Sequence, residues 1–254
     1  MTQLQALIID VDGTLADTER DGHRIAFNKA FAEAGLDWDW NVARYGELLK
    51  VTGGKERIRQ YLSEDHPAIL EQAGIDDRIR ELHAAKTRHY VALLETGAIP
   101  LRPGVRRLLD EAEAEGLRLA IATTTTPENV TALLEATLGK EGPSRFEVIA
   151  AGDVVPAKKP APDIFSHALN AMDLPAKACL ALEDSDNGVR SARGAGLEVV
   201  VTTNDYTRDQ DFAGAMAVLD GLGEVDSPAC VLSGPALPGA VLDIATLRDW
   251  FARA

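Results

Sequence analysis

The sequence predicts an α/β protein: a doubly wound, Rossmann-like parallel sheet core with an inserted α-helical cap domain. Five short apolar runs, helical patterns between them, and one long helical stretch after the first run support this. Continuous apolar runs are typical of strands that are buried on both faces of a parallel sheet. Because helices alternate with these runs, βαβ units and a doubly wound sheet are expected.

The five expected strands are short and lie at residues 6–9, 117–122, 146–150, 179–182 and 197–201. The second strand is followed by a helix that begins at Pro127, with Thr126 as its N-cap. The fourth strand is followed by an amphipathic helix over residues 186–194. Beyond about residue 222 the chain is rich in Gly, Pro and small residues. We expect only a short helix there, over residues 244–252.

The stretch between the first two strands is too long for a single crossover helix, and its pattern is helical throughout. Apolar residues such as Phe27 and Phe31 recur at intervals of three to four, as in the core of a helical bundle. We therefore expect a cap domain over residues 18–96 and a core domain formed by residues 1–17 and 97–254.

The charge of the chain limits its partners. It has 26 Lys and Arg residues against 40 Asp and Glu residues, a formal net charge of −14 at pH 7. Binding to nucleic acid draws its affinity from clustered Lys and Arg, so no nucleic-acid partner is expected. The same charge repels an anionic sugar phosphate, and a protein that binds one must concentrate cations at the site.

The N-terminus lacks the basic start and the small-residue cleavage site of a signal peptide. No apolar run approaches the roughly 20 residues of a membrane span. We therefore expect a cytoplasmic protein with no membrane partner. Cys179 and Cys230 are far apart in the sequence, so both are expected to be reduced.

Polar residues follow four of the expected strands. In open parallel sheets the carboxyl ends of the strands form the ligand crevice. Each polar set alone has an innocent explanation, as a helix cap or as a solvated loop. Their recurrence at successive strand ends indicates one site, formed by Asp10-Val11-Asp12-Gly13-Thr14, Thr123-Thr124, Lys158-Lys159-Pro160 and Glu183-Asp184.

These residue types suit phosphoryl transfer. Three neighbouring carboxylates can hold a hard cation such as Mg²⁺ beside a phosphate. The transfer needs a cation, a lysine, a hydroxyl and backbone donors around the phosphoryl oxygens. Asp10 can serve as nucleophile because a carboxylate with an ordinary pKa of about 3.9 is ionised at neutral pH. Asp12, two residues on, can protonate the leaving oxygen and then activate water.

The motifs resemble those of the haloacid dehalogenase superfamily of aspartate-nucleophile phosphatases. This resemblance implies Mg²⁺ as cofactor and Asp10 as both nucleophile and metal ligand. Asp12 would be the general acid/base, with its backbone carbonyl on the metal. Asp184 would be a further metal ligand, and Glu183 would act beside the metal through water.

The same resemblance implies the phosphate contacts. Thr123 and the backbone amide of Thr124 would hold phosphate oxygens, and Lys159 would neutralise the phosphoryl group and the nucleophile. The helical insertion looks like the small mobile cap of the superfamily.

Within the superfamily the chain is similar to β-phosphoglucomutase and, more closely, to the CbbY-type phosphatases that act on xylulose-1,5-bisphosphate. The similarity covers nearly the whole chain and rests on residues 17–24, 45–50, 53–57 and 151–156. It implies a monomeric phosphatase for a small sugar phosphate, foremost xylulose-1,5-bisphosphate, that forms an aspartyl-phosphate on Asp10. The chain departs from the pattern at Thr52, which stands where glycine is common.

One segment of the expected cap has the features of a phosphate site. Lys55 and Arg57 lie in the first turns of an expected helix, where positive charge opposes the helix dipole unless an anion binds. The preceding Gly53 and Gly54 expose backbone amides that can bind phosphate. A solvated basic helix start is the alternative interpretation. Weaker candidates for substrate contact are Glu19, His23, Tyr45 and Lys86.

Three other functions fit parts of the pattern. A haloacid dehalogenase needs no second aspartate such as Asp12, and a silent binding protein needs no intact Asp10. A β-phosphoglucomutase-like phosphosugar mutase uses the same motifs and differs by returning the phosphoryl group to a sugar. The sequence leaves the choice between phosphatase and mutase open.

Overall fold

The computed structural model describes residues 3–254, so residues 1 and 2 of the expected core domain lie outside it. In this part of the chain seven strands form one sheet in the order β3-β2-β1-β4-β5-β6-β7. The strands β1 to β6 are parallel, and β7 is antiparallel to β6. The predicted fold class is confirmed. The strands are Ala6–Ile9, Arg118–Ala122, Val148–Ala150, Cys179–Glu183, Glu198–Thr202, Ala217–Leu219 and Val231–Ser233.

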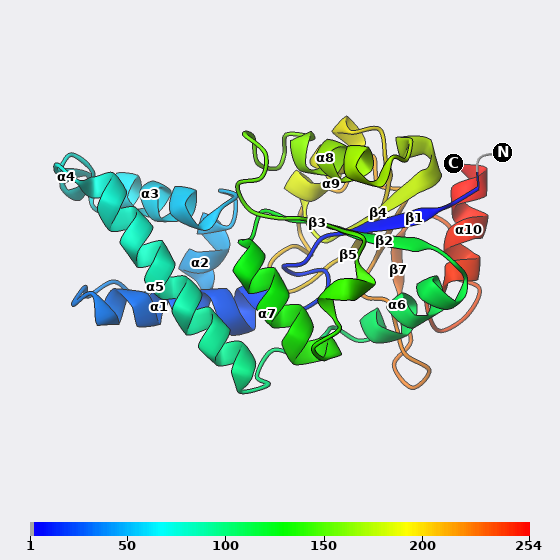
Figure 1. The fold of residues 1–254 in the computed structure, drawn as a ribbon, viewed down its shortest axis with the longest axis horizontal. Coiled ribbons are helices and arrows are strands. Elements are labelled where there is room, and N and C mark those ends of the chain that lie inside the picture. Colours follow the sequence, from blue (N-terminus) through cyan, green and yellow to red (C-terminus); the bar gives the residue numbers. More distant parts are fainter. Residues whose placement is uncertain (1–2) are drawn as a thin grey trace.

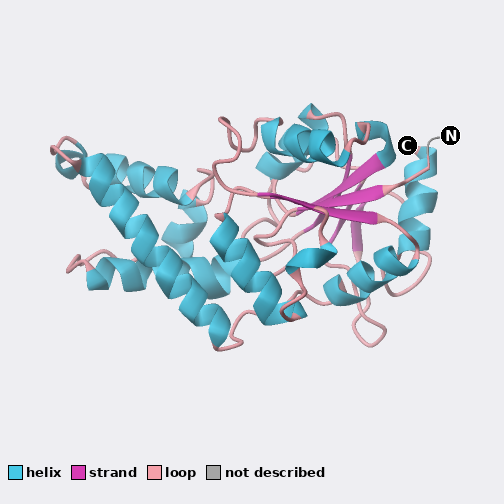
Figure 2. Ribbon diagram, in the orientation of Figure 1, coloured by secondary structure: helices cyan, strands magenta, loops and turns pink. Residues whose placement is uncertain are grey.

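Helices cover both faces of the sheet (Figures 1 and 2). They are α6 (Val105–Ala114), α7 (Pro127–Leu138), α8 (Asp163–Met172), α9 (Asp186–Gly194) and α10 (Ile244–Arg253). One face packs against α6, α7 and α10, and the other against α8 and α9. Alternate residues of β1 enter the two cores, Leu7 and Ile9 on one side and Ala6 and Ile8 on the other. Burial on both faces explains why the strand is continuously apolar.

A second group of helices comes between β1 and β2 in the sequence. In space this group lies beyond the carboxyl ends of the strands (Figure 1, left). These are η1 (Glu19–His23), α1 (Arg24–Glu33), α2 (Val42–Leu48), α3 (Gly54–Asp65), α4 (Pro67–Leu70) and α5 (Ile75–Glu95). They enclose an apolar core of their own, with Phe27, Trp40 and Ile58 fully buried. The chain enters and leaves this group side by side, because Ala16 pairs with Leu101. The exact division at residues 17/18 and 96/97 stays a prediction.

Two details differ from the sequence prediction. The strands β6 and β7 are not predicted, and each has only three residues. The helix α7 begins at Pro127 as expected, but the side chain of its N-cap, Thr126, makes no capping hydrogen bond. The Thr126 hydroxyl is instead buried without a partner in the described chain.

Among residues 3–254 no helix is long and apolar enough to cross a membrane.

Candidate active site

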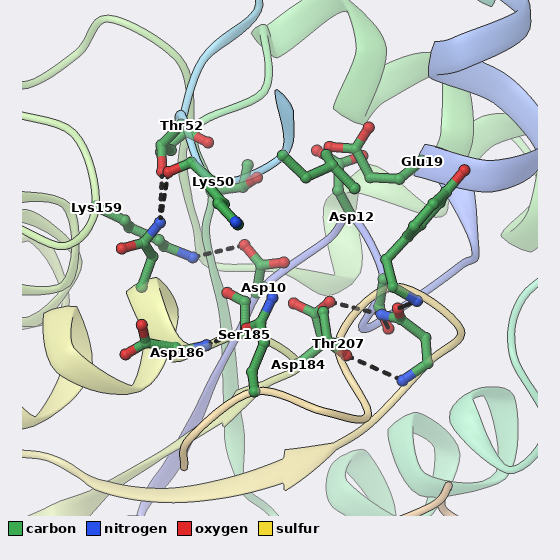
Figure 3. Close-up of a pocket in the computed structure, with 18 of the residues that line it drawn as sticks. Asp10, Asp12, Glu19, Lys50, Thr52, Lys159, Asp184, Ser185, Asp186 and Thr207 are labelled. Atoms are coloured by element: carbon green, nitrogen blue, oxygen red, sulfur yellow. Dashed lines mark hydrogen bonds and ion pairs between the residues drawn. The ribbon is translucent and has the colours of Figure 1, made fainter. Parts of the chain in front are cut away.

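The carboxyl ends of β1, β2 and β4 meet in one crevice that faces the second group of helices (Figure 3). Asp10 follows β1, Thr123 follows β2, and Glu183 and Asp184 lie at the end of β4. The strand order reverses at β1, and ligands of open α/β sheets bind at such a switch point. Lys159 reaches the crevice from the segment between β3 and α8. The structure thus brings the four predicted motifs together around a cavity of about 440 Å³.

Lys159 links two buried carboxylates. Its Nζ donates to Oδ1 of Asp10 at 2.6 Å (Figure 3). It also donates to Oε1 of Glu183 at 2.5 Å. Burial disfavours the charged form, but the two carboxylates outweigh it and raise the pKa of Lys159. The ammonium group therefore stays charged at neutral pH.

Three buried carboxyl groups lie near Lys159, which supplies only one positive charge. Asp10, Glu183 and Asp184 each offer one oxygen, and these atoms lie within 4.8 Å of one another. Burial raises the pKa of Asp10 to about 8, and burial together with the neighbouring carboxylates raises that of Asp184 well above its ordinary value. A cation among these oxygens would remove that cost of ionisation. The donor set, all oxygen and buried, fits a hard divalent metal ion.

Asp12 lies beside this cluster but in different surroundings. Its Oδ1 accepts a hydrogen bond from Thr18 Oγ1 at 2.5 Å and lies 2.8 Å from His23 Nε2. Burial alone would raise the pKa of Asp12, but His23 and Thr18 hold it at about 2. The Asp12 carboxylate is therefore ionised at neutral pH, and it needs a proton before it can act as an acid.

Thr123 and Thr124 line the same cavity from the end of β2. Thr123 is buried, and its Oγ1 accepts from the backbone N–H of Thr125 at 3.3 Å. That contact leaves its O–H free to donate to a ligand in the cavity. The predicted position of both threonines in the crevice agrees with the structure, and their contacts with phosphate stay a prediction.

Half-buried Glu19 and buried Arg57 line the opposite wall of the cavity and form a cluster with buried Tyr45 behind them. The Tyr45 hydroxyl donates to Glu19. Arg57 donates to the Tyr45 hydroxyl at 2.8 Å and lies 3.4 Å from Glu19. Glu19 and His23 stand at the two ends of the π-helical segment η1, a geometry that is frequent at functional sites.

A small second chamber lies next to this cluster, between the helices and the β2–α7 and β3–α8 loops. Lys86 of α5 lines it with its ammonium 5.2 Å from the ring centres of Phe27 and Tyr90. Burial lowers the pKa of Lys86 to about 8, although Glu19 and Asp12 act against that shift. The chamber therefore holds a buried lysine that carries a positive charge at neutral pH and loses it at slightly higher pH.

Gly53, Gly54 and Lys55 also line the second chamber, and the expected helix begins at Gly54. Lys55 is already paired, because its Nζ lies 2.7 Å from Asp153 Oδ2 on the β3–α8 loop. Lys158 of the same loop pairs with Glu56 at 3.0 Å and with Asp153 at 3.2 Å. Lys55, Glu56, Asp153 and Lys158, here called the ionic bridge, join the cap helices to the sheet.

Several residues of the cavity are not singled out by the sequence analysis. Lys50 points from the cap helices into the cavity (Figure 3). Asn204 donates from Nδ2 to Asp184 Oδ2 at 2.6 Å. Behind the cavity lining, Arg102 donates to the backbone carbonyls of Gly13, Thr202 and Thr203. Asn204 and Arg102 could have been found, since one follows β5 at the same edge and the other lies where the chain returns from the cap.

Comparison with known proteins identifies the family. A family model described as haloacid dehalogenase-like hydrolase matches residues 4–196. The chain belongs to the haloacid dehalogenase-like hydrolases. This hydrolase is 48% identical over 250 residues to "Protein CbbY, plasmid" of Cupriavidus necator, which covers 97% of this chain and 96% of the relative. It is 54% identical over 213 residues to protein CbbY of Rhodobacter capsulatus, and this match covers 84% of this chain and 91% of the relative.

A solved structure supports the same relationship. It is a crystal structure of a CbbY mutant from Rhodobacter sphaeroides in complex with xylulose-1,5-bisphosphate. The sequences are 48% identical, the TM-score is 0.81, and the match covers 87% of this chain and 96% of that chain. The predicted superfamily and the similarity to CbbY proteins are confirmed. The chain is an enzyme, and its family and its CbbY relatives support a phosphatase.

Proposed function

We propose that this hydrolase is a Mg²⁺-dependent phosphatase that releases phosphate from xylulose-1,5-bisphosphate through an aspartyl-phosphate on Asp10. The observation that carries the proposal is the crevice in which Asp10, bonded to Lys159, faces a cavity lined by Thr123 and by cap residues. The CbbY structure in complex with xylulose-1,5-bisphosphate supports this substrate. The roles predicted for Thr124, Glu183 and Asp184 belong to the same proposal.

In the first step the Asp10 carboxylate attacks the phosphorus, and the bond from phosphorus to the sugar oxygen breaks. A proton on Asp12 passes to that oxygen, and Lys159 and Thr123 balance the charge on the phosphoryl oxygens. Because its surroundings hold the pKa of Asp12 at about 2, Asp12 must take up a proton when the substrate binds.

In the second step a water molecule attacks the phosphorus of the aspartyl-phosphate and gives its proton to the Asp12 carboxylate. The bond from Asp10 to phosphorus breaks, which releases inorganic phosphate and regenerates the Asp10 carboxylate. Asp10, Glu183 and Asp184 would hold the metal ion, with the Asp12 carbonyl as a further ligand. When bound, Mg²⁺ supplies positive charge that stabilises the transferring phosphoryl group.

The second phosphate of a bisphosphate needs cations away from Asp10. Arg57 and Lys86 are buried, and Lys55 lies at the chamber beside them. We propose that this side of the site, with Gly53, Gly54, Glu19, His23 and Tyr45, holds the sugar and its distal phosphate. Lys55 can take part once the phosphate replaces Asp153 as its partner.

The phosphosugar mutase is the second function that the sequence leaves open, and one experiment separates the two. Purified protein is incubated with MgCl₂ and a panel of sugar monophosphates and bisphosphates, and released phosphate is measured. We expect the highest kcat/KM with xylulose-1,5-bisphosphate and no isomerisation of β-glucose 1-phosphate. Isomerisation without net phosphate release would favour the mutase and contradict the proposal.

A further inference from the structure

The turn that follows β5 reaches the acidic cluster through a single side chain, that of Asn204. Its Oδ1 accepts from the backbone N–H of Tyr206 at 2.9 Å. Its backbone N–H donates to Thr207 Oγ1 at 3.1 Å, and its carbonyl accepts from the N–H of Thr207 at 3.1 Å. These bonds hold Asn204 in one position at the edge of the cavity.

The two ends of the Asn204 amide can be told apart. Because Oδ1 faces the N–H of Tyr206, the NH₂ group faces Asp184 Oδ2 at 2.6 Å and the carbonyl of Gly13 at 3.4 Å. Both of these atoms only accept hydrogen bonds. The reverse orientation would set the amide oxygen against a carboxylate and a carbonyl, and the NH₂ group against an N–H.

This contact fixes one oxygen of Asp184. Within residues 3–254 the other oxygen, Oδ1, makes no hydrogen bond with another side chain. Gly13, with φ +89°, comes so near that a Cβ there would lie 2.3 Å from Asp184 Oδ2. The Asp184 carboxylate is therefore held between Gly13 and Asn204, which limits rotation of the side chain and leaves Oδ1 available as a metal ligand.

We propose that Asn204 is a positioning residue for the metal ion: its NH₂ group orients Asp184 and ties the loop after β1 to the loop after β4. The inference rests on the proposed metal-dependent function. Groups that hold metal ligands in place commonly change metal affinity by about 10- to 100-fold when they are removed. A residue that only stabilises the turn would leave metal affinity unchanged.

The test separates the turn from the contact with Asp184. Asn204→Ser keeps a hydroxyl that can accept from Tyr206 but is too short to reach Asp184. Thr207→Val removes the acceptor for the Asn204 backbone and leaves the Asn204 side chain intact. Binding of MgCl₂ alone is measured by titration calorimetry, and unfolding of the metal-free proteins is followed by circular dichroism.

We expect the Mg²⁺ Kd of Asn204→Ser to rise by about 10- to 100-fold. For Thr207→Val we expect a lower unfolding midpoint and a Kd within twofold of wild type. Equal Mg²⁺ binding by wild type and Asn204→Ser would overturn the inference alone. Absence of Mg²⁺ binding by the wild-type protein would overturn the proposed metal-dependent function, and the inference with it.

A second variant serves if Asn204→Ser does not fold. Asn204→Thr also keeps a hydroxyl that can accept from Tyr206 and is likewise too short to reach Asp184. Because its metal affinity should be lower, we expect MgCl₂ to raise the unfolding midpoint of Asn204→Thr by less than that of wild type. An equal rise in both proteins would show that only the turn matters.

Discussion

The two walls of the active site carry opposite charge. On the sheet side, Asp10, Glu183 and Asp184 share the ammonium group of Lys159. On the cap side, cations line the second chamber, where Lys86 lies buried without a carboxylate in hydrogen-bond contact among the described residues. The sheet side therefore has more buried carboxylates than cations, and the cap side has a buried cation, Lys86, that no carboxylate binds directly.

This difference shows in the ionisation of the buried groups. Burial raises the pKa of Asp10 to about 8, because Lys159 compensates only in part. Burial lowers the pKa of Lys86 to about 8. On each wall, burial disfavours the charged form of these groups until a ligand of the opposite sign is present. A metal ion on the sheet side and a phosphate on the cap side would favour the charged forms of both. The following predictions test the walls separately.

The largest effect is expected from Asp10→Asn. The amide is a poor nucleophile, so kcat should fall by at least about 10⁴-fold while circular dichroism and the unfolding midpoint stay close to wild type. Steady-state phosphate release at saturating substrate is the measurement, and Asp249→Asn, at an exposed position of α10, is the control. Turnover near the wild-type rate by a folded Asp10→Asn protein would refute the nucleophile.

Asp12→Ala should reduce kcat by roughly 10²- to 10⁴-fold, the usual contribution of acid/base catalysis. A substrate such as p-nitrophenyl phosphate has a leaving group that needs no proton. For this substrate, the rate constant for transfer of the phosphoryl group to Asp10, measured as the burst of p-nitrophenol, should therefore fall much less. If both substrates lose the same factor in that step, Asp12 does not protonate the leaving oxygen.

Lys55→Ala tests the cap wall. A lost charged hydrogen bond costs about 1.5–3 kcal/mol, so the ratio of kcat/KM for xylulose-1,5-bisphosphate over a small monophosphate should fall by roughly 10- to 150-fold. Damage to the fold would lower kcat/KM for both substrates and leave their ratio unchanged.

Asp153→Asn is the matched control for Lys55→Ala, because it removes the partner of Lys55 in the ionic bridge and leaves the lysine in place. The ratio should then stay level or rise. A fall of the same size in both variants would mean that Lys55 acts through the ionic bridge and not on the distal phosphate.

The smallest effect, one on stability, is expected from Lys86→Met. The folded chain holds the pKa of Lys86 at about 8, below its ordinary value of 10.5. Between these values the unfolded chain binds more protons, so this residue makes the free energy of unfolding rise with pH in that window. At pH 7 the buried charge is present, and Lys86→Met should stabilise the metal-free protein by about 1–3 kcal/mol.

Urea unfolding at pH 7 and pH 10 measures this difference. The advantage of Lys86→Met should shrink as the pH rises through the window from about 8 to 10.5, since wild type then loses its buried charge. A constant difference between the two proteins would indicate that packing, and not charge, sets the effect.

The sheet-side wall could be predicted from the sequence because the chemistry follows from topology. Asp10, Thr123 and Asp184 each come directly after a buried run, and parallel strands bring such positions to one edge. The same rule applied to β5 would have drawn attention to Asn204. The short strands β6 and β7 were not predicted, because pairing with neighbouring strands decides their conformation.

The cap-side wall was less predictable. The sequence indicates that Lys55 lies at a helix start, which is correct, but it contains no sign that Asp153 is the partner of this lysine. The two residues are 98 positions apart. Such pairs depend on how helices dock on the sheet, and that docking is fixed by side-chain packing over many residues rather than by a local motif.

The edges of the sheet affect how copies of the chain meet. Both outermost strands, β3 and β7, have three residues, so each offers a neighbouring chain very few unpaired backbone groups. A long, flat edge is a template on which a second chain can add a strand and from which aggregates grow. Short edges deny that template. Self-association by strand addition is thereby disfavoured, and the monomer expected from the sequence stays a prediction.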